Sequence, residues 1–418
     1  MTFLNVVEIE SAVIGLATAY PTATQLITLP HVTAEGRWSH ALRIGTGTCP
    51  NTGILLVSGT HAREWGGPDI LINFAADLLE AWSAGTGLVY GGTSFSANVV
   101  GSIVRNIELI VFPNINPDGR HHSQTSFAMH RKNRNPASGG GSNYGIDLNR
   151  NYDFLWNFPV AFHPDAVDAG TLASNDPGSD LFHGTGPFSE AETKNVRWLF
   201  DNYRTIRRFI DLHSYGGLIL HPWGDDTNQT TNTNKSFKNP AWNGHRGIDG
   251  GSYAEYIDSS DLADLQSVGN VTKAAIAGVR GESYTVAQSF YLPGWTTYPT
   301  SGASDDWAFS RRYSNVAHRR VLGFVFEFNK THTFFPNWSE MEYIIRDVDA
   351  GLVAFCRNAV PKFSILSLWC LFKDWYFVAW RRLFPWEIWG PYGPLGKIRN
   401  LRFIGRGPRD DIAGRGSG

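Results

Sequence analysis

Hydrophobic residues in the first 360 positions form two alternating patterns, continuous apolar runs and stretches with helical spacing. The continuous runs, such as Ile-Leu-Leu-Val within residues 53–58, are typical of strands buried on both faces of a sheet. They predict strands over residues 39–46, 53–58, 107–113, 206–212 and 321–328. The helical spacing predicts helices over residues 6–20, 68–82, 189–203, 262–279 and 340–355. This alternation predicts an α/β fold, with a mixed, mostly parallel central sheet and helices on both faces.

Local signals mark where some of these elements begin and end. Pro68 falls in the first turn of one predicted helix, and Ser189-Glu-Ala-Glu192 has the sequence of a capping box at the start of another. Residues 157–188 and 224–260 are rich in Gly, Asn, Asp, Ser and Pro and predict long surface loops. Sites in parallel sheets lie beyond the carboxyl ends of the strands, so we expect these loops to surround a site.

The chain changes character near residue 360. Five tryptophans crowd residues 369–389, and Gly, Pro and Arg dominate from there to the end. We therefore predict one catalytic domain over residues 1–358 and a C-terminal tail over residues 359–418, whose role the sequence does not give. Charged residues at 373, 374, 381 and 382 interrupt the apolar stretch, which excludes a membrane span there. A packing appendage, a disordered end and an interfacial anchor remain open.

Composition excludes some partners and leaves the compartment open. The 418 residues carry a formal net charge of −2 with 18% charged residues, which gives no reason to expect nucleic acid or an anionic membrane as a partner. The three cysteines are widely spaced and form no disulfide framework or C-x-x-C metal site. The first residues lack a signal peptide, so we expect a cytoplasmic protein as the chain is written, or a secreted one if an upstream segment is missing.

A histidine and a glutamate follow the buried strand predicted over residues 53–58. They are His61 and Glu64 in His-Ala-Arg-Glu, and His213 ends another predicted strand in Phe-Ile-Asp-Leu-His. Two imidazoles and one carboxylate, with a fourth position left for water, form a ligand set of catalytic zinc. Chance supplies about one such His-x-x-acid pair in a chain with this many acids, and a lone His213 is by itself more typical of a core residue.

Further motifs follow in a fixed order along the chain. They are Phe112-Pro-Asn-Ile-Asn-Pro-Asp-Gly119, Met129-His-Arg-Lys-Asn-Arg134, Gly145-Ile-Asp-Leu-Asn-Arg-Asn-Tyr152, Tyr298-Pro-Thr-Ser-Gly-Ala-Ser-Asp-Asp-Trp307 and Phe326-Glu327-Phe328. With His61, Glu64 and His213, they make the chain resemble the zinc carboxypeptidases of the A/B/T type from about Val6 to Phe355. The tail lies outside this resemblance.

The resemblance implies a metallocarboxypeptidase that hydrolyses the C-terminal bond of peptides and proteins with one Zn²⁺ per chain. His61, Glu64 and His213 would be the zinc ligands, and Asp147 would accept the other ring N–H of a ligand histidine. Glu327, an acid inside an apolar strand, would be the general base that activates water together with zinc. A structural ion pair is the alternative explanation for that buried acid.

The remaining roles implied by the resemblance concern the substrate. Arg134 would stabilise the oxyanion, and Asn149 and Arg150 would bind the free α-carboxylate. Tyr298 would close over that carboxylate, and Arg63 would extend the path by which the substrate enters. Such a substrate is the C-terminus of a peptide or protein.

Asp305 would occupy the base of the side-chain pocket, where an acid favours C-terminal Lys or Arg. A shift of one residue would exchange it with Asp306. Four arginines between Trp307 and Glu327 (Arg311, Arg312, Arg319 and Arg320) suggest a basic insertion near the cleft, and we find no recognisable inhibitory pro-segment. Two other functions stay open, a hydrolase of cell-wall peptides or side-chain amides and an inactive binding module. The intact Asn149-Arg150 pair disfavours the first, and the presence of Glu327 and all three ligands disfavours the second.

Overall fold

The computed structural model describes residues 2–47, 52–229, 231–292 and 297–361. Eight strands form one sheet in the order β1-β2-β6-β3-β7-β12-β8-β11. Their bounds are β1 Thr24–Thr28, β2 His40–Ile44, β3 Thr52–Ser58, β6 Ile107–Phe112, β7 Ile206–Ser214, β8 Leu218–His221, β11 Thr285–Gln288 and β12 Leu322–Phe328. The central strands β6, β3, β7 and β12 run parallel, as do β8 and β11, while β1–β2, β2–β6 and β12–β8 are antiparallel. The predicted mixed, mostly parallel sheet is confirmed.

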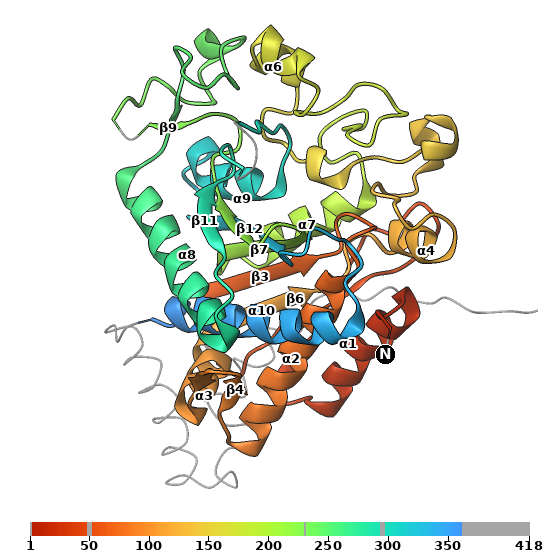
Figure 1. Ribbon diagram of the computed structural model, residues 1–418, viewed down its shortest axis with the longest axis vertical. Coiled ribbons are helices and arrows are strands. Elements are labelled where there is room, and N and C mark those ends of the chain that lie inside the picture. The colour runs from red at the N-terminus through yellow and green to blue at the C-terminus, as the bar shows by residue number, and fades with distance from the viewer. Residues whose placement is uncertain (1, 48–51, 230, 293–296, 362–418) are drawn as a thin grey trace, which may run out of the picture. The chain divides into compact units, whose positions relative to one another are not determined.

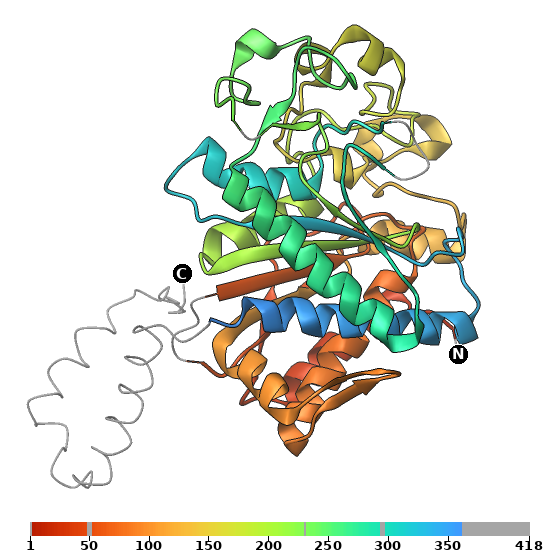
Figure 2. The ribbon, with the colours of Figure 1, turned by 60° about the vertical axis from the view of Figure 1, so that its left-hand side comes forward.

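Helices cover both faces of this sheet (Figures 1 and 2). Helices α2 and α10 cover one face with α8 packed against α10, and α9 lies against β7 and β12 on the other. The helices are α1 Val6–Ala19, α2 Gly66–Ala84, α3 Ala97–Asn106, α4 Pro117–Thr125, α5 Phe158–Ala161, α6 Pro164–Asp168, α7 Ala191–Asn202, α8 Ser259–Arg280, α9 Ser304–Ser314 and α10 Trp338–Ala359. Two small pairs of strands lie outside this sheet, β4 Leu88–Tyr90 with β5 Thr93–Phe95 and β9 Asn228–Gln229 with β10 Glu255–Tyr256. Short 3-10 helices lie at Pro136–Ser138, Gly141–Asn143, Leu148–Arg150 and Pro240–Trp242. None of the described helices is long and apolar enough to cross a membrane.

The strands that carry the site are apolar because the sheet is buried on both faces. Ile54, Leu55, Leu56 and Val57 of β3 have no exposed surface. Burial of each such side chain contributes roughly 1.5–3 kcal/mol to the stability of the fold. Strands buried on both faces therefore appear in the sequence as continuous apolar runs. The polar residues that follow are therefore held at the carboxyl ends of rigid, buried strands.

Helix α2 begins directly after Glu64 and approaches β3 closely. A side chain at Gly67 would place its Cβ 2.8 Å from the Cβ of Ser58. Glycine at this position lets the start of the helix pack against the end of the strand. The loop that carries His61 and Glu64 is short and fixed at both ends for this reason.

The capping box predicted at Ser189–Glu192 is wrong. Helix α7 has Glu190 as its N-cap, with no side-chain cap hydrogen bond. The hydroxyl of Ser189 donates to Glu190 instead, at 2.8 Å, and the Glu192 carboxylate accepts from the Asn133 amide at 3.3 Å. Because Glu192 is buried against another segment, its carboxylate does not turn back to the start of its own helix.

The long irregular segments are largely as predicted. Short elements interrupt them, α5 and α6 within residues 157–188 and β9, β10 and a 3-10 helix at Pro240–Trp242 within residues 224–260, where α8 begins at Ser259. One compact unit spans Met1–Val360. The tryptophan-rich part of the tail lies outside the described residues, so the domain boundary at residue 358 stays a prediction.

Candidate metal centre

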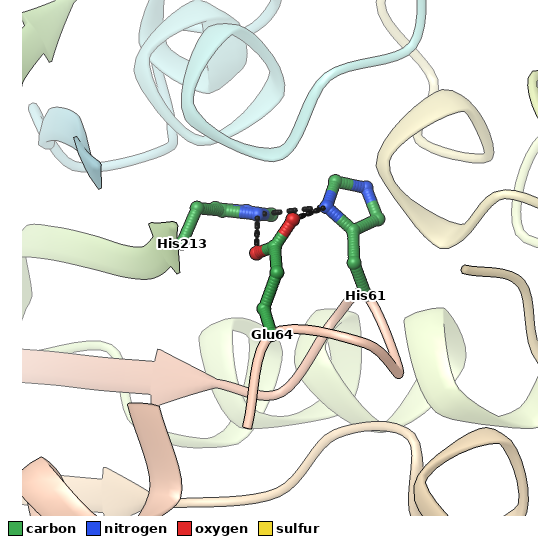
Figure 3. Close-up of side chains that lie close together, drawn as sticks. All are labelled: His61, Glu64 and His213. Atoms are coloured by element: carbon green, nitrogen blue, oxygen red, sulfur yellow. Dashed lines mark hydrogen bonds and ion pairs between the residues drawn. The ribbon is translucent and has the colours of Figure 1, made fainter. Parts of the chain in front are cut away.

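His61, Glu64 and His213 converge at the carboxyl ends of β3 and β7, as Figure 3 shows. The first two lie on the loop after β3, and His213 lies near the end of β7. Nδ1 of His61 is 2.8 Å from the Glu64 carboxylate, Nδ1 of His213 is 3.0 Å from it, and the two Nδ1 atoms are 3.0 Å apart. All three side chains are buried. The expected convergence of these three residues is observed.

A carboxylate lies behind each histidine. Nε2 of His61 is 3.2 Å from Asp147 Oδ1, and Nε2 of His213 is 3.1 Å from Asp211 Oδ2. Burial opposes the charge on His213, but Asp211 and Glu64 outweigh it and raise its pKa well above the usual value. Burial likewise opposes the charge on Glu64, and the two imidazoles outweigh it to lower that pKa. The outer carboxylates fix both rings with Nδ1 facing inward.

This donor set fits a zinc ion. Two Nδ1 atoms 3.0 Å apart face each other and one carboxylate. With bonds of about 2.0–2.1 Å and tetrahedral angles, zinc ligands lie roughly 3.3 Å from one another, close to the observed separations. A shared cation satisfies both ring nitrogens and the Glu64 carboxylate together. Of the described residues, only these three form such a metal-sized cluster.

Asp147 connects the histidine to a wider network. Its side chain is fully buried and accepts two hydrogen bonds from the Arg131 guanidinium at 2.9 and 3.0 Å, besides facing His61. Burial opposes the charge on Arg131, whereas Asp147, Tyr298 and Glu64 raise its pKa. Asp147 therefore has the position that the resemblance implied, and Arg131 is a partner that the sequence reading missed.

Glu327 lies beside His213 on the neighbouring strand. The register pairs Glu327 of β12 with His213 of β7, so both side chains stand on one face of the sheet. Glu327 is the one residue of β12 that is not fully buried. Burial raises the pKa of its carboxyl to about 8, and the negative charge of Glu64 adds to this while His213 opposes it. No ion pair to Glu327 is found among the described residues, so a structural ion pair does not explain this acid.

Arg134 packs against Tyr144. The guanidinium lies over the tyrosine ring at 3.7 Å and donates to its hydroxyl, and Glu35 is 3.7 Å from Nε. Nε and Nη1 are buried and have no hydrogen-bond partner in the described structure. Two donors of a held guanidinium thus remain for another acceptor.

Arg63, next to the ligand Glu64, faces the loop segments. Its guanidinium lies 4.8 Å from the Phe334 ring centroid and 3.3 Å from the Asp180 carboxylate. Asp180 belongs to the long segment of residues 157–188, so that loop does reach the site.

Asn149 and Arg150 form a single turn directly after Asp147. Arg150 is buried, donates to the Asn149 carbonyl at 2.7 Å, and has a buried Nε without a hydrogen-bond partner in the described structure. The Asn149 amide oxygen accepts from the backbone N–H of Ser304 at 2.9 Å, which joins this turn to helix α9. Tyr298 acts on the charge of Arg131, so it lies near the same network.

Asp305 and Asp306 occupy the first turn of α9 and are both buried. Asp305 accepts from the Ser289 hydroxyl at 3.1 Å, whereas Asp306 accepts the backbone N–H of Gly224 with both oxygens at 3.1 Å. Burial is the largest cause that raises both pKa values, and the negative charge of Asp305 adds to the shift at Asp306. Both oxygens of Asp306 thus accept the Gly224 backbone N–H, whereas Asp305 accepts a side-chain hydrogen bond from Ser289 besides backbone contacts in its own helical turn.

The basic segment after Trp307 lies elsewhere than expected. Residues 315–321 connect α9 to the start of β12, beside the start of β7, whereas His213 lies near the end of β7. The predicted position near the cleft is wrong. Helix α9 carries the chain from the site to the opposite end of the strands, where β7 and β12 begin.

Besides Arg131, two positions were missed by the sequence analysis. Asp211 stands two residues before His213 on one strand, hence on the same face, and this spacing was a usable signal. Asn116 holds the site from outside, since its amide donates to the carbonyls of Thr60 and Lys132 at 3.2 and 3.1 Å. The Asn-Ile-Asn-Pro motif therefore positions the loop of His61.

Comparison with known proteins identifies relatives of this chain. The family model described as zinc carboxypeptidase matches residues 9–350. Carboxypeptidase B of Astacus astacus is 28% identical over 72% of this chain and 80% of that protein. Carboxypeptidase A4 of Mus musculus is 27% identical over 74% of this chain, and carboxypeptidase B of Helicoverpa zea 30% over 61%. The chain spans only 60% and 52% of the lengths of these last two proteins.

Solved structures share the fold. Carboxypeptidase A from Helicoverpa armigera superposes with a TM-score of 0.63 at 22% identity, covering 86% of this chain and 74% of that one. Bovine thrombin-activatable fibrinolysis inhibitor, solved with tick carboxypeptidase inhibitor, gives 0.61 at 19% identity, covering 86% and 98%. At these identities the likeness concerns the fold alone.

Proposed function

Because the chain belongs to the zinc carboxypeptidase family, we propose that it removes the C-terminal residue of peptides, with His61, Glu64 and His213 as ligands of one zinc ion. The observation that carries this proposal is the convergence of three ligand atoms beside Glu327. When bound, zinc lowers the pKa of water and polarises a carbonyl. Proton transfer, stabilisation of the oxyanion and binding of the substrate carboxylate are carried out by side chains of the protein.

In this proposal Glu327 is the group that moves the proton. Glu327 stands next to His213 at the carboxyl end of its strand, and the residue is half-buried. It takes a proton from the attacking water and delivers it to the leaving amine. A raised pKa suits this role, because such a carboxyl both accepts and returns a proton near neutral pH.

Arg134 stabilises the charge that develops on the carbonyl oxygen. Its ring contact with Tyr144 holds the guanidinium before the substrate arrives, and Nε and Nη1 are still free to donate. A donor fixed in advance costs no reorganisation when the negative charge forms.

Arg150 binds the free α-carboxylate at the C-terminus of the substrate. Its guanidinium is buried and carries an unused donor, and a guanidinium pairs with a carboxylate through two parallel hydrogen bonds. Asn149 supports the same turn, and Tyr298 covers the carboxylate from the opposite side in this proposal. Recognition of a free carboxylate confines cleavage to the last residue.

The first test is the Arg150→Ala variant. We expect kcat/KM for a peptide with a free C-terminus to fall about 100-fold or more, because a buried charge-assisted pair is lost in the transition state. The amidated form of the same peptide is a poor substrate for both proteins and should change little. Arg150→Lys checks folding, and Arg105→Gln, on the exposed surface of α3, is the control. A wild-type rate with Arg150→Ala would contradict the assignment.

Asp305 is proposed to favour C-terminal Lys and Arg. In the Asp305→Asn variant, which keeps the Ser289 hydrogen bond, we expect kcat/KM for Lys or Arg to fall about 50-fold or more, while a C-terminal Leu is affected less than about threefold. Asp306→Asn is the matched control, because Asp306 is occupied by the Gly224 N–H. If Asp306→Asn alone lost the basic preference, the two neighbours would have to exchange roles.

The same carboxyl predicts a pH effect on specificity. Burial raises the pKa of Asp305, so in the free enzyme a larger share is protonated at mildly acidic pH. Only the ionised form attracts a cationic side chain. The ratio of kcat/KM for Lys over Leu should therefore rise with pH through this range, and it should become flat in Asp305→Asn.

A further inference from the structure

Five arginines line a depression at the end of the sheet where β7 and β12 begin. The depression has a volume of about 530 Å³ and lies between the start of β7 and the segment that joins α9 to β12. Its basic lining is Arg204, Arg207, Arg312, Arg319 and Arg320, with His318 beside them. Arg204, Arg312 and Arg319 are exposed and Arg207 is half-buried.

Carboxylates pair with the arginines at both ends of the segment that joins α9 to β12, and the arginines between them and on the adjacent start of β7 form no ion pair among the described residues. Arg311 pairs with Asp201 at 2.6 Å, and Arg320 pairs with Asp264 at 2.7 Å and with Asp261. These pairs fix the two ends of the segment. Arg204, Arg207, Arg312 and Arg319 form no ion pair with any carboxylate in the described part of the chain.

Such a grouping of like charges has an electrostatic cost. Burial lowers the pKa of Arg207, and the positive charge of Arg319 lowers it further. The pKa of His318 is lowered by burial and then by Arg311. Elsewhere the fold provides carboxylates, as at Arg280, which pairs with Asp347 and Glu340. The central four are left for an external anion.

We propose that this depression binds a compact polyvalent anion, a small molecule that carries several phosphate or sulfate groups. Guanidinium forks match the oxygen pairs of such groups. The volume lies in the usual range of small-molecule sites. None of the described residues that line the depression is Phe, Tyr or Trp, so this lining offers no stacking surface for nucleobases. The charge and size favour a phosphorylated small molecule over a nucleic-acid strand.

The site is independent of the metal centre. Arg207 and His213 lie six positions apart on β7, and a strand rises about 3.3 Å per residue, so the two are roughly 20 Å apart. An anion in the depression touches no residue of the proposed catalytic set. This inference therefore does not depend on the proposed function.

The test is calorimetric titration of the full chain with inorganic tripolyphosphate at low ionic strength. We expect saturable binding by the wild type, and at least tenfold weaker binding by Arg207→Gln/Arg319→Gln. The control Arg105→Gln/Arg346→Gln removes the same charge from exposed positions on α3 and α10 and should bind as the wild type does. Orthophosphate should bind more weakly than tripolyphosphate, because it reaches fewer of the four guanidinium groups.

Three results would overturn the proposal. They are the absence of tripolyphosphate binding, equal weakening in both double variants, and binding of a single-stranded oligonucleotide in place of tripolyphosphate. Peptide hydrolysis measured on the same samples should be equal in the wild type and Arg207→Gln/Arg319→Gln. That measurement separates the loss of the anion site from a loss of folding.

Discussion

Glu327→Gln is expected to keep its zinc and to lose turnover by roughly 1000-fold or more. Glutamine has nearly the shape of glutamate but neither accepts nor returns the proton. The ligands do not change, because Glu327 is on β12 while the ligands lie on the loop after β3 and on β7. The measurements are the zinc content per chain and kcat on one peptide with a free C-terminus.

The control for this substitution is Glu80→Gln, an exposed residue of α2. Its zinc content and kcat should equal those of the wild type. A wild-type kcat in Glu327→Gln would remove Glu327 from the reaction. Loss of zinc in Glu327→Gln would show instead that the residue supports the metal.

His213→Ala should lose both zinc and activity. It removes one of three ligand atoms that lie within 4.8 Å of one another, and the two that remain form an open bidentate site. We expect zinc content near zero after dialysis against a mild chelator and a kcat/KM at least 1000-fold lower. The measurement is elemental analysis of dialysed protein alongside the peptide assay, and full zinc occupancy in the variant would contradict the ligand assignment.

Asp211→Asn provides a graded comparison for the same ligand. Asp211 lies behind His213 and touches no proposed substrate group, so it is a positioning residue for the imidazole. Loss of such a partner typically weakens metal binding 10- to 100-fold, and added zinc should restore most of the activity. The same zinc should not restore His213→Ala.

The sequence predicts the strands near the site well because they are buried on both faces. Continuous apolar runs such as residues 53–58 and 322–328 have few interpretations other than a buried strand, and polar residues within or after them are conspicuous. His61, Glu64, His213 and Glu327 were found in this way. The edge strands β1 and β11 were not predicted, since half-exposed strands of four or five residues have no such run. Strand β8 is buried, but it has only four residues, and its apolar run is too short to stand out.

Other features depend on contacts between distant segments, which no local pattern contains. The pairing of Arg131 with Asp147 brings together two motifs 16 residues apart, and Asn133 draws Glu192 away from the capping role that its sequence suggests. The basic residues after Trp307 were placed wrongly because they are close to Asp305 in sequence. The sequence does not show that the intervening helix α9 leads away from the site to the other end of the strands. Asp211 was missed although its spacing from His213 was visible.

The most direct test of the central claim is diffraction from crystals of the active protein, recorded at the zinc absorption edge. The account predicts one anomalous peak per chain, about 2.0–2.2 Å from Nδ1 of His61, Nδ1 of His213 and the Glu64 carboxylate. A peak that contacts only one of these side chains would contradict the account, as would active crystals with no zinc at this position.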